Sequence, residues 1–272
     1  MCEREYRNKQ WLIEQFDKYK TPNKVAKSTG YPRTCITRYA TKYNIYSVKY
    51  NRSRSNHVNE TYFANIDTPS KAYFLGFIMA DGNMYQNENG KLQFSIKIKN
   101  TDRDILYKLA NEIEFPIEKI TQREEKRKDS ITKCAEIKIY NQKFCSYLVD
   151  LGIVPRKTGK EYMPNIKDEF KKDFIRGFID GDGWISKDGF HLGFASSSLK
   201  LIESIKLYIL KELNIDLTIY NDQIYTIKSY KRKNIYQMLK HFYYEGCISL
   251  DRKYNLANIK KQEIIEDLIG SL

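Results

Sequence analysis

Two aspartates, Asp81 and Asp182, occupy the same place in two similar nine-residue segments. The segments read FLGFIMADG at 74–82 and IRGFIDGDG at 175–183. In both, the run of apolar residues predicts a helix that ends at the aspartate, with a glycine after it. Two carboxylates held side by side repel each other, and the pKa of one rises unless cations neutralise them.

Carboxylate oxygens are the ligands that hard divalent cations such as Mg²⁺ prefer. A divalent ion between two aspartates would lower the pKa of an attacking water and stabilise the attacking and leaving oxygens, which suits phosphodiester hydrolysis. An isolated Asp-Gly pair after a helix is usually only a turn. The repetition of the whole segment is therefore what favours a site.

Small residues lie four positions apart on each predicted helix: Gly76 and Ala80 on one, Gly177 and Gly181 on the other. Small residues at this spacing let two helix backbones approach more closely than ordinary packing allows. We therefore expect the two helices to pack together and bring the aspartates close. Gly82 and Gly183 are expected to let the chain turn sharply after each helix.

The two segments open a longer internal repeat, which runs from Ser70 to Lys157 and again from about Phe170 to Lys253. In both copies a strand, a helix, two strand-like runs and a helix follow the motif. These elements are predicted at 92–99, 102–113, 117–123, 134–140 and 142–151, and again at 191–197, 199–213, 216–220, 224–229 and 233–244. We interpret the copies as two pseudo-symmetric αββαββα units.

The chain is strongly basic, with 47 Lys and Arg against 34 Asp and Glu and a formal net charge of +13. Such a balance favours a polyanionic partner, usually nucleic acid, although a merely soluble basic protein is the alternative. The five cysteines have no CxxC spacing, which argues against a disulfide scaffold or a zinc site. No apolar run approaches the ~18 residues that span a membrane.

The apolar spacing and the Pro and Gly positions in residues 1–45 predict a small all-α domain of the helix-turn-helix type. Its helices are predicted at 10–20, from Pro22 to Gly30, and from Pro32 to about Lys42. The last helix would enter the major groove of DNA. Its polar side carries Arg33, Thr34, Thr37, Arg38 and Lys42. The alternative is an ordinary three-helix bundle with a polar outer face.

Residues 46–68 are polar and lack a helical period, so we interpret them as a basic linker. Arg52 and Arg54 would enter the minor groove if the linker lies along DNA, and the alternative is a passive tether. Alternation in the predicted strands places polar side chains on one face, where they would contact DNA or simply face solvent. They are Gln93, Ser95, Lys97, Lys99, Lys138, Tyr140 and Lys228.

With both nine-residue motifs in one chain, residues 69–260 resemble the LAGLIDADG homing endonucleases. The resemblance implies an α+β body whose halves, 69–160 and 161–272, form a DNA-binding saddle, with the helix-turn-helix as an accessory module. It also implies a monomer that binds a long, asymmetric site on double-stranded DNA.

The resemblance assigns Asp81 and Asp182 as catalytic ligands of Mg²⁺ or Mn²⁺, with Ala80 and Gly181 in the same metal site. It places Lys157 and Lys253 beside the scissile phosphates, and Lys97 and Lys99 are rivals for this role in the first copy. Met79 departs from the family pattern, where an acidic residue is common, whereas Asp180 keeps it.

The implied function is site-specific, metal-dependent cleavage of both DNA strands. Two alternatives remain open: an RNA maturase that assists intron splicing, and a DNA-binding regulator without catalytic activity. A cytoplasmic location is expected, associated with the nucleoid in a bacterium or a phage-infected cell, and an organelle is also possible.

Overall fold

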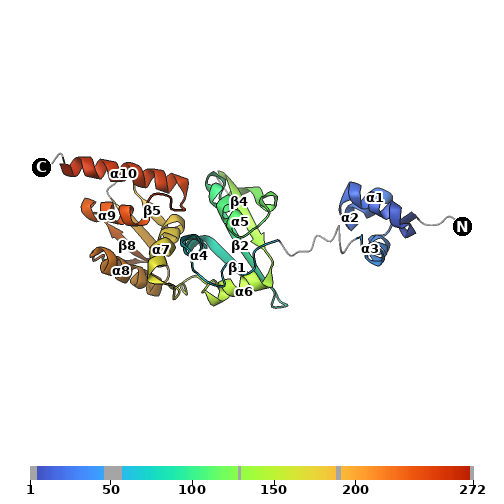
Figure 1. The fold of residues 1–272 in the computed structure, drawn as a ribbon, viewed down its shortest axis with the longest axis horizontal. Helices are drawn as coiled ribbons and strands as arrows, with labels where there is room; N and C mark the ends of the chain where they lie inside the picture. Colours follow the sequence, from blue (N-terminus) through green and yellow to red (C-terminus); the bar gives the residue numbers. More distant parts are fainter. Residues whose placement is uncertain (1–4, 46–56, 128–129, 188–190, 270–272) are drawn as a thin grey trace. The chain divides into compact units, whose positions relative to one another are not determined.

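The computed structural model describes residues 5–45, 57–127, 130–187 and 191–269. The chain divides into two compact units, Met1–Arg54 and Ser55–Leu272 (Figure 1). Each unit has its own hydrophobic core, and each is considered by itself below.

The first unit contains a short 3₁₀ turn, η1 (Glu5–Arg7), and three helices: α1 (Lys9–Tyr19), α2 (Pro22–Thr29) and α3 (Arg33–Lys42). The predicted signals delimit α2, because Thr21 Oγ1 accepts a hydrogen bond from the Lys24 amide and Gly30 adopts a left-handed φ of 74°. A small apolar core of Leu12, Phe16, Val25, Ile36 and Ala40 holds the helices together.

The second unit consists of two halves with the same order of elements. The first half contains α4 (Pro69–Asp81), β1 (Gly82–Gln86), β2 (Leu92–Lys99), η3 (Asn100–Asp102), α5 (Asp104–Glu112), η4 (Ile117–Lys119), β3 (Thr121–Arg127), β4 (Ser130–Ile139) and α6 (Gln142–Asp150). The second half contains α7 (Asp168–Asp182), β5 (Gly183–Ile185), β6 (Leu192–Ser196), α8 (Leu199–Leu213), β7 (Ile219–Asp222), β8 (Ile224–Ser229) and α9 (Arg232–Phe242).

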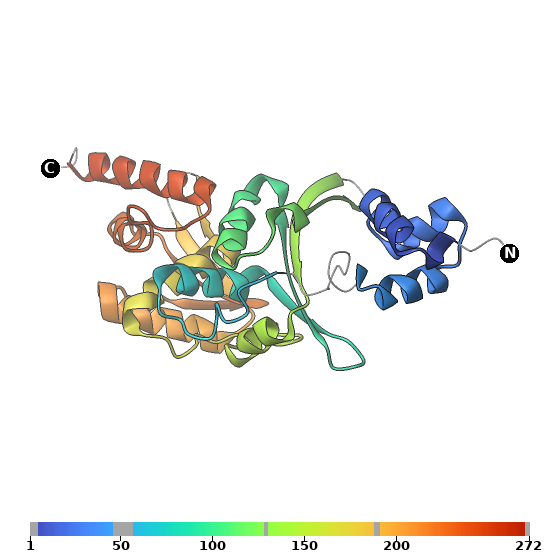
Figure 2. The same ribbon diagram turned by 45° about the vertical axis from the view of Figure 1, so that its right-hand side comes forward.

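Both halves form a four-stranded antiparallel sheet, in the orders β1-β2-β4-β3 and β5-β6-β8-β7. The predicted α+β class with two αββαββα units is confirmed. The chain then adds a long helix, α10 (Asp251–Ile269), which has no counterpart in the first half and lies along the second (Figure 2).

Helices α4 and α7 pack against each other at the junction of the halves (Figure 1). A Cβ added to Gly76 would lie 1.9 Å from the carbonyl oxygen of Phe174, and one added to Gly177 would lie 2.0 Å from that of Tyr73. Backbone thus meets backbone at both glycines, as the spacing of the small residues predicted. This close contact sets the two helix ends, and the aspartates on them, next to each other.

The glycines that follow the two helices have a different role from the one expected. Gly82 and Gly183 have φ of −73° and −103°, which residues with side chains adopt readily. A Cβ would instead lie 2.5 Å from the Ile78 carbonyl oxygen at Gly82 and 2.7 Å from that of Ile179 at Gly183. Glycine is needed there for a close approach to the last helical turn.

Residues 57–68 belong to the second unit and not to a free linker. Tyr62 and Phe63 are buried in its core, and the Tyr62 hydroxyl donates a hydrogen bond of 2.7 Å to Glu112. The predicted linker at 46–68 was therefore wrong for its second part, residues 57–68. The aromatic side chains there are apolar enough to be buried in the core. Arg52 and Arg54 lie outside the described residues. No described helix is long and apolar enough to cross a membrane.

Candidate active site

Asp81 and Asp182 are the last residues of α4 and α7, and the packing of these helices brings them together. A Cβ built on Gly181, the residue before Asp182, would lie 3.2 Å from Asp81 Oδ2. Asp81 is half-buried and Asp182 is exposed, and within the described part of the chain no group donates a hydrogen bond to either carboxylate.

The electrostatic surroundings make both aspartates receptive to cations. Burial, and then the negative charge of Asp182, raise the pKa of Asp81 to about 6. Burial also raises the pKa of Asp182. Both stand at helix C-termini, where the helix dipole disfavours negative charge further. Two neighbouring carboxylates without donors fit a divalent cation, which would offset their repulsion and supply the missing partner.

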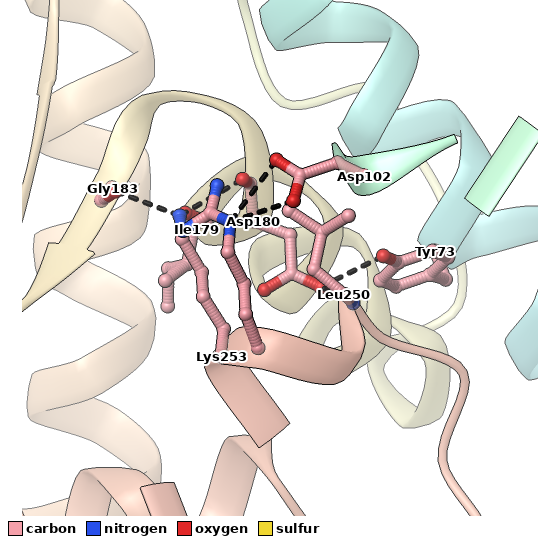
Figure 3. Close-up of polar contacts among 8 residues, drawn as sticks. Tyr73, Asp102, Ile179, Asp180, Gly183, Leu250 and Lys253 are labelled. Atoms are coloured by element: carbon pink, nitrogen blue, oxygen red, sulfur yellow. Dashed lines mark hydrogen bonds and ion pairs between the residues drawn. The ribbon is translucent and has the colours of Figure 1, made fainter. Parts of the chain in front are cut away.

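Lys157 and Lys253, the lysines that end the two repeats, lie at this same place. The Lys157 ammonium donates to the carbonyl oxygens of Met79 and Ala80, at 2.6 and 3.0 Å. The Lys253 ammonium donates to those of Ile179, Asp180 and Gly183, at 2.5, 2.8 and 2.7 Å (Figure 3). Each lysine thus binds the C-terminal carbonyls of its own half's central helix.

The lysines act electrostatically across the junction of the halves. Among the positive charges that lower the pKa of Asp81, Lys253 acts most strongly, and for Asp182 the strongest is Lys157. Burial depresses the pKa of both ammonium groups, to about 8 for Lys253. Both lysines act on both aspartates, but the stronger pairing is crossed, because each aspartate interacts most with the lysine of the other half.

Each crossed pair has a further carboxylate beside it that the sequence analysis missed. Asp102 lies near Asp81 and accepts two hydrogen bonds from Arg252 Nε, at 2.9 and 3.0 Å (Figure 3). Glu161 lies near Asp182 and is buried, and its Oε2 has no partner among the described residues. Neither stands in a recognisable motif, so only the folded chain brings them to the site.

A cavity of about 350 Å³ opens beside Asp81. Its charged lining comes from both halves: Asp81, Lys97, Lys99, Asp102, Glu125, Asp180 and Arg252. Lys97 and Lys99 thus reach the same cavity, but Lys97 is held by Glu125 at 2.7 Å. Across the described residues no group of three His, Cys, Asp or Glu is arranged to hold a metal, so a metal site would rest on the aspartate pair and nearby backbone.

Of the two flanking residues placed in the metal site, Ala80 has a carbonyl oxygen already engaged by Lys157. A Cβ on Gly181 would lie 2.3 Å from the Ala80 Cβ, so the two residues touch across the helix pair. Their small size brings the aspartates together, which is a packing role in addition to any contact with a metal.

The polar residues predicted on the sheets lie on β2, on β4 and directly after it, and on β8, but not all are accessible. Gln93 is half-buried and Lys97, Lys99 and Tyr140 are exposed, whereas Ser95 is buried at 8% exposure and is a poor candidate for direct contact. Lys138 is half-buried and lies 3.2 Å from Glu136. Pairs such as this contribute little stability at a surface, so DNA phosphates can replace the acidic partner.

The second sheet carries an aromatic group that the sequence analysis did not single out. The Lys228 ammonium lies 5.0 Å from the ring centre of Tyr220 and 5.3 Å from that of Tyr230. Both rings are exposed, at 44% and 55%, and His191 packs on Tyr230. A cation between two accessible rings is suited to contacts with nucleic acid.

In the first unit, the predicted contact residues lie along α3. Arg33, Thr34, Arg38 and Lys42 are exposed and Thr37 is half-buried. The Arg38 guanidinium lies 5.2 Å from the centre of the Tyr39 ring. Three cations of α3 are therefore accessible to solvent, as a recognition helix requires.

Sequence comparison identifies both halves of the second unit. Residues 169–264 match the model of a LAGLIDADG-like domain, and residues 70–138 match that of the WhiA LAGLIDADG-like domain. Together these ranges include more than half of the chain. The chain belongs to the LAGLIDADG family.

Individual relatives of this LAGLIDADG protein are distant. It is 24% identical over 238 residues to the uncharacterized protein MJ0398 of Methanocaldococcus jannaschii. The aligned region covers 83% of this chain and 81% of that protein. It is 25% identical over 203 residues to the DNA-directed RNA polymerase subunit Rpo1C of the same organism, covering 74% of this chain and 21% of the relative. The solved structure of I-DmoI in complex with DNA and Ca has a TM-score of 0.49 and 17% identity, over 74% of this chain and 99% of that one.

The raised pKa of Asp81 leads to a prediction about stability. Folding raises this pKa from 3.8 to about 6, so the folded state binds the proton more tightly than the unfolded state. The resulting stability is present below pH 4 and is lost as the pH rises past 6. In metal-free protein at pH 8, Asp81→Asn should therefore raise the free energy of unfolding by up to about 3 kcal/mol, with no gain near pH 4.

Urea denaturation at several pH values measures this difference. Asp168→Asn is a control of opposite sign, because Lys171 and Lys211 lower the pKa of Asp168 to about 2 and its charge stabilises the fold above pH 4. Saturating Mg²⁺ should reduce the advantage of Asp81→Asn. Equal stability of wild type and Asp81→Asn at pH 8 without metal would show that Asp81 is not electrostatically strained.

Proposed function

We propose that this LAGLIDADG protein is a site-specific endonuclease that cuts both strands of DNA and needs a divalent cation. One observation carries the proposal: two aspartates without hydrogen-bond donors, one half-buried and one exposed, lie side by side at the ends of paired helices, each near a desolvated lysine. A merely structural pair of this kind would be costly to keep, because two like charges held close together repel each other.

In this proposal Asp81 and Asp182 hold the cations, Mg²⁺ or Mn²⁺, with their carboxylate oxygens. When bound, a divalent ion supplies a water of lowered pKa and stabilises charge on the leaving oxygen. Lys253 beside Asp81 and Lys157 beside Asp182 place positive charge where each scissile phosphate would lie, which stabilises the negative charge that develops there. The crossed pairs give one centre for each strand.

The remaining surfaces fit a DNA duplex as the partner. Net charge of +13 favours a polyanion, and the basic and aromatic side chains of the two sheets lie on faces that are not packed in the core. Since the two halves carry different residues on these faces, we propose that one chain acts alone on an asymmetric site. The helix-turn-helix unit would lengthen the recognised sequence.

The test uses a duplex that joins the two genomic sequences flanking the element that encodes the protein. The full chain is incubated with this duplex in Mg²⁺, Mn²⁺ or Ca²⁺ and, as a control, in EDTA. The proposal expects a staggered double-strand break with Mg²⁺ or Mn²⁺ and none in EDTA. Tight binding without cleavage in any metal would favour the DNA-binding regulator, and specific binding of the element's RNA transcript would favour the maturase.

The exposed cations of α3 lead to a prediction about DNA binding. Arg38→Ala removes an exposed cation in the middle of this helix and should weaken binding of the same duplex about tenfold. It should also reduce the slope of log affinity against log salt concentration by about 1 if the contact is to phosphate. Fluorescence anisotropy at several salt concentrations measures both.

Lys9→Ala is the matched control, because Lys9 is an exposed cation at the start of α1, outside the proposed recognition helix. It should change affinity much less than Arg38→Ala. Equal losses for the two variants would mean that the first unit contributes charge only and does not recognise DNA through α3.

A further inference from the structure

Asp180 is a buried carboxylate near the candidate active site that takes no part in the chemistry proposed above. It is 1% exposed. Its Oδ2 accepts hydrogen bonds from the Tyr73 hydroxyl and the Leu250 amide, both at 2.7 Å (Figure 3). Its Oδ1 accepts one from the Tyr243 hydroxyl, also at 2.7 Å. Burying a charged group is costly unless donors compensate it, and these three donors do so.

The bond to Leu250 fixes the start of α10. The amides of Lys253 and Tyr254 both donate to the Leu250 carbonyl at 2.9 Å, so Leu250 opens the first turn of this helix. Three residues later, the Lys253 ammonium binds the carbonyls at the end of α7. Asp180 and Lys253 thus anchor one helical turn to α7 at two points.

The first half has no equivalent of this anchor. Met79 occupies the position that corresponds to Asp180, and its thioether is only a weak hydrogen-bond acceptor. Lys157 lies in the non-helical stretch between α6 and α7, outside any helical turn. Its only described links to α4 are the two hydrogen bonds that its ammonium donates to carbonyl oxygens of that helix. The two ammonium groups therefore bind similar carbonyls, but only the backbone of Lys253 belongs to a turn that is anchored separately.

We infer that Asp180 is a positioning residue for Lys253, acting through the first turn of α10, and that only one of the two strand cleavages depends on it. The strand-specific part of this inference rests on the proposed function. Loss of the anchor would let Lys253 shift relative to Asp81, and a displacement of about 1 Å in a reacting group can cost about 100-fold in rate. The centre formed by Asp182 and Lys157 has no such connection to Asp180.

The test measures the cleavage rate of each DNA strand separately, on a duplex whose two strands carry different labels. Lys253→Met and Lys157→Met first show which strand depends on which lysine. Asp180→Met then introduces at this position the residue that the first half has at Met79. The Lys253-dependent strand should be cut about 100-fold more slowly, and the rate of cutting of the other strand should change little. Asp180→Asn keeps an acceptor oxygen for Tyr73 and Leu250 and should restore most of the rate.

Two neighbouring tyrosines provide a matched pair of variants that disturb the fold less. Tyr243 donates to Asp180 and Tyr244 donates to Asp173, both at 2.7 Å and both to α7. Only Tyr243 shares its acceptor with α10. Tyr243→Phe should therefore slow cutting of the Lys253-dependent strand, whereas Tyr244→Phe should leave both strands unchanged.

Hydrogen–deuterium exchange of the metal-free, DNA-free protein supplies a readout that needs no cleavage. Backbone amides at 250–254 should exchange faster in Asp180→Met and Tyr243→Phe than in wild type or Tyr244→Phe. Unchanged exchange there, or equal losses on both strands, would overturn the inference. If the variants show the expected faster exchange at 250–254 but the wild-type protein cuts neither strand, the anchoring of α10 would be supported and the proposed function refuted.

Discussion

Replacing either terminal aspartate, as Asp81→Asn or Asp182→Asn, should abolish double-strand cleavage while leaving the protein folded and bound to its DNA. The amide removes one negative charge from the pair that would hold the cation but keeps the size of the side chain. A bound metal contributes several kcal/mol to transition-state stabilisation, so single-turnover cleavage should slow by at least about 1,000-fold. DNA affinity should not fall, because a negative charge near phosphate has been removed.

Asp150→Asn is the matched control for these variants. Asp150 is the last residue of α6, as Asp81 is of α4, but it is exposed and is not among the charged groups that shift the pKa of Asp81 or Asp182. Its substitution should leave the cleavage rate unchanged. Cleavage by Asp81→Asn and Asp182→Asn at the wild-type rate would exclude the proposed metal site, even if the protein binds DNA.

The second large effect concerns the junction of the halves. Gly177→Ala would place a Cβ 2.0 Å from the backbone oxygen of Tyr73, and no side-chain rotation relieves a clash with backbone. Overpacking of a core costs typically 1–3 kcal/mol, so a backbone clash at the centre should cost about 3 kcal/mol or more. Cleavage should fall as well, because the helices would separate and carry the aspartates apart.

Urea denaturation of the metal-free protein measures the loss, and Gly246→Ala provides a comparison. Gly246 has a φ of 76° but no heavy atom within 4 Å of an added Cβ, so alanine there meets only backbone strain. That strain should cost about 1 kcal/mol. A loss in Gly177→Ala no larger than in Gly246→Ala would show that the helices can separate at little cost.

The sequence predicted those parts of the fold in which the local pattern and tertiary packing agree. The bounds of β2 matched the alternation of Leu92–Lys99, and Thr21 and Gly30 delimited α2 as their side chains suggested. The helices α4 and α7 were predicted because the motif occurs twice, and their contact because small residues recur on one face.

Other elements were missed where local signals are weak. Strands β1 and β5 have only five and three residues, and the glycines that begin them, Gly82 and Gly183, were predicted to be turn residues after each helix. The predicted strand at 117–123 begins later, at Thr121, because Ile117–Lys119 forms a 3₁₀ turn. Helix α10 lies beyond the repeat, so comparison of the two copies gave no sign of it.

The candidate site was predictable only in part, for a physical reason. Asp81, Asp182, Lys157 and Lys253 stand at matched places in the repeat, but their crossed pairing arises from the packing of one half on the other. Asp102 and Glu161 contribute through space, from a turn after β2 and from the stretch between α6 and α7. No spacing along the chain indicates such contacts.

The crossed pairing has a consequence for damaged or shortened forms of the protein. A break in the backbone between Lys157 and the start of α7 would leave Asp81 with Lys157 on one fragment and Asp182 with Lys253 on the other. Neither fragment alone would then hold an aspartate together with the lysine that faces it. We expect no nicking from either piece, so the reaction would be restricted to molecules in which both halves have been synthesised and have folded together.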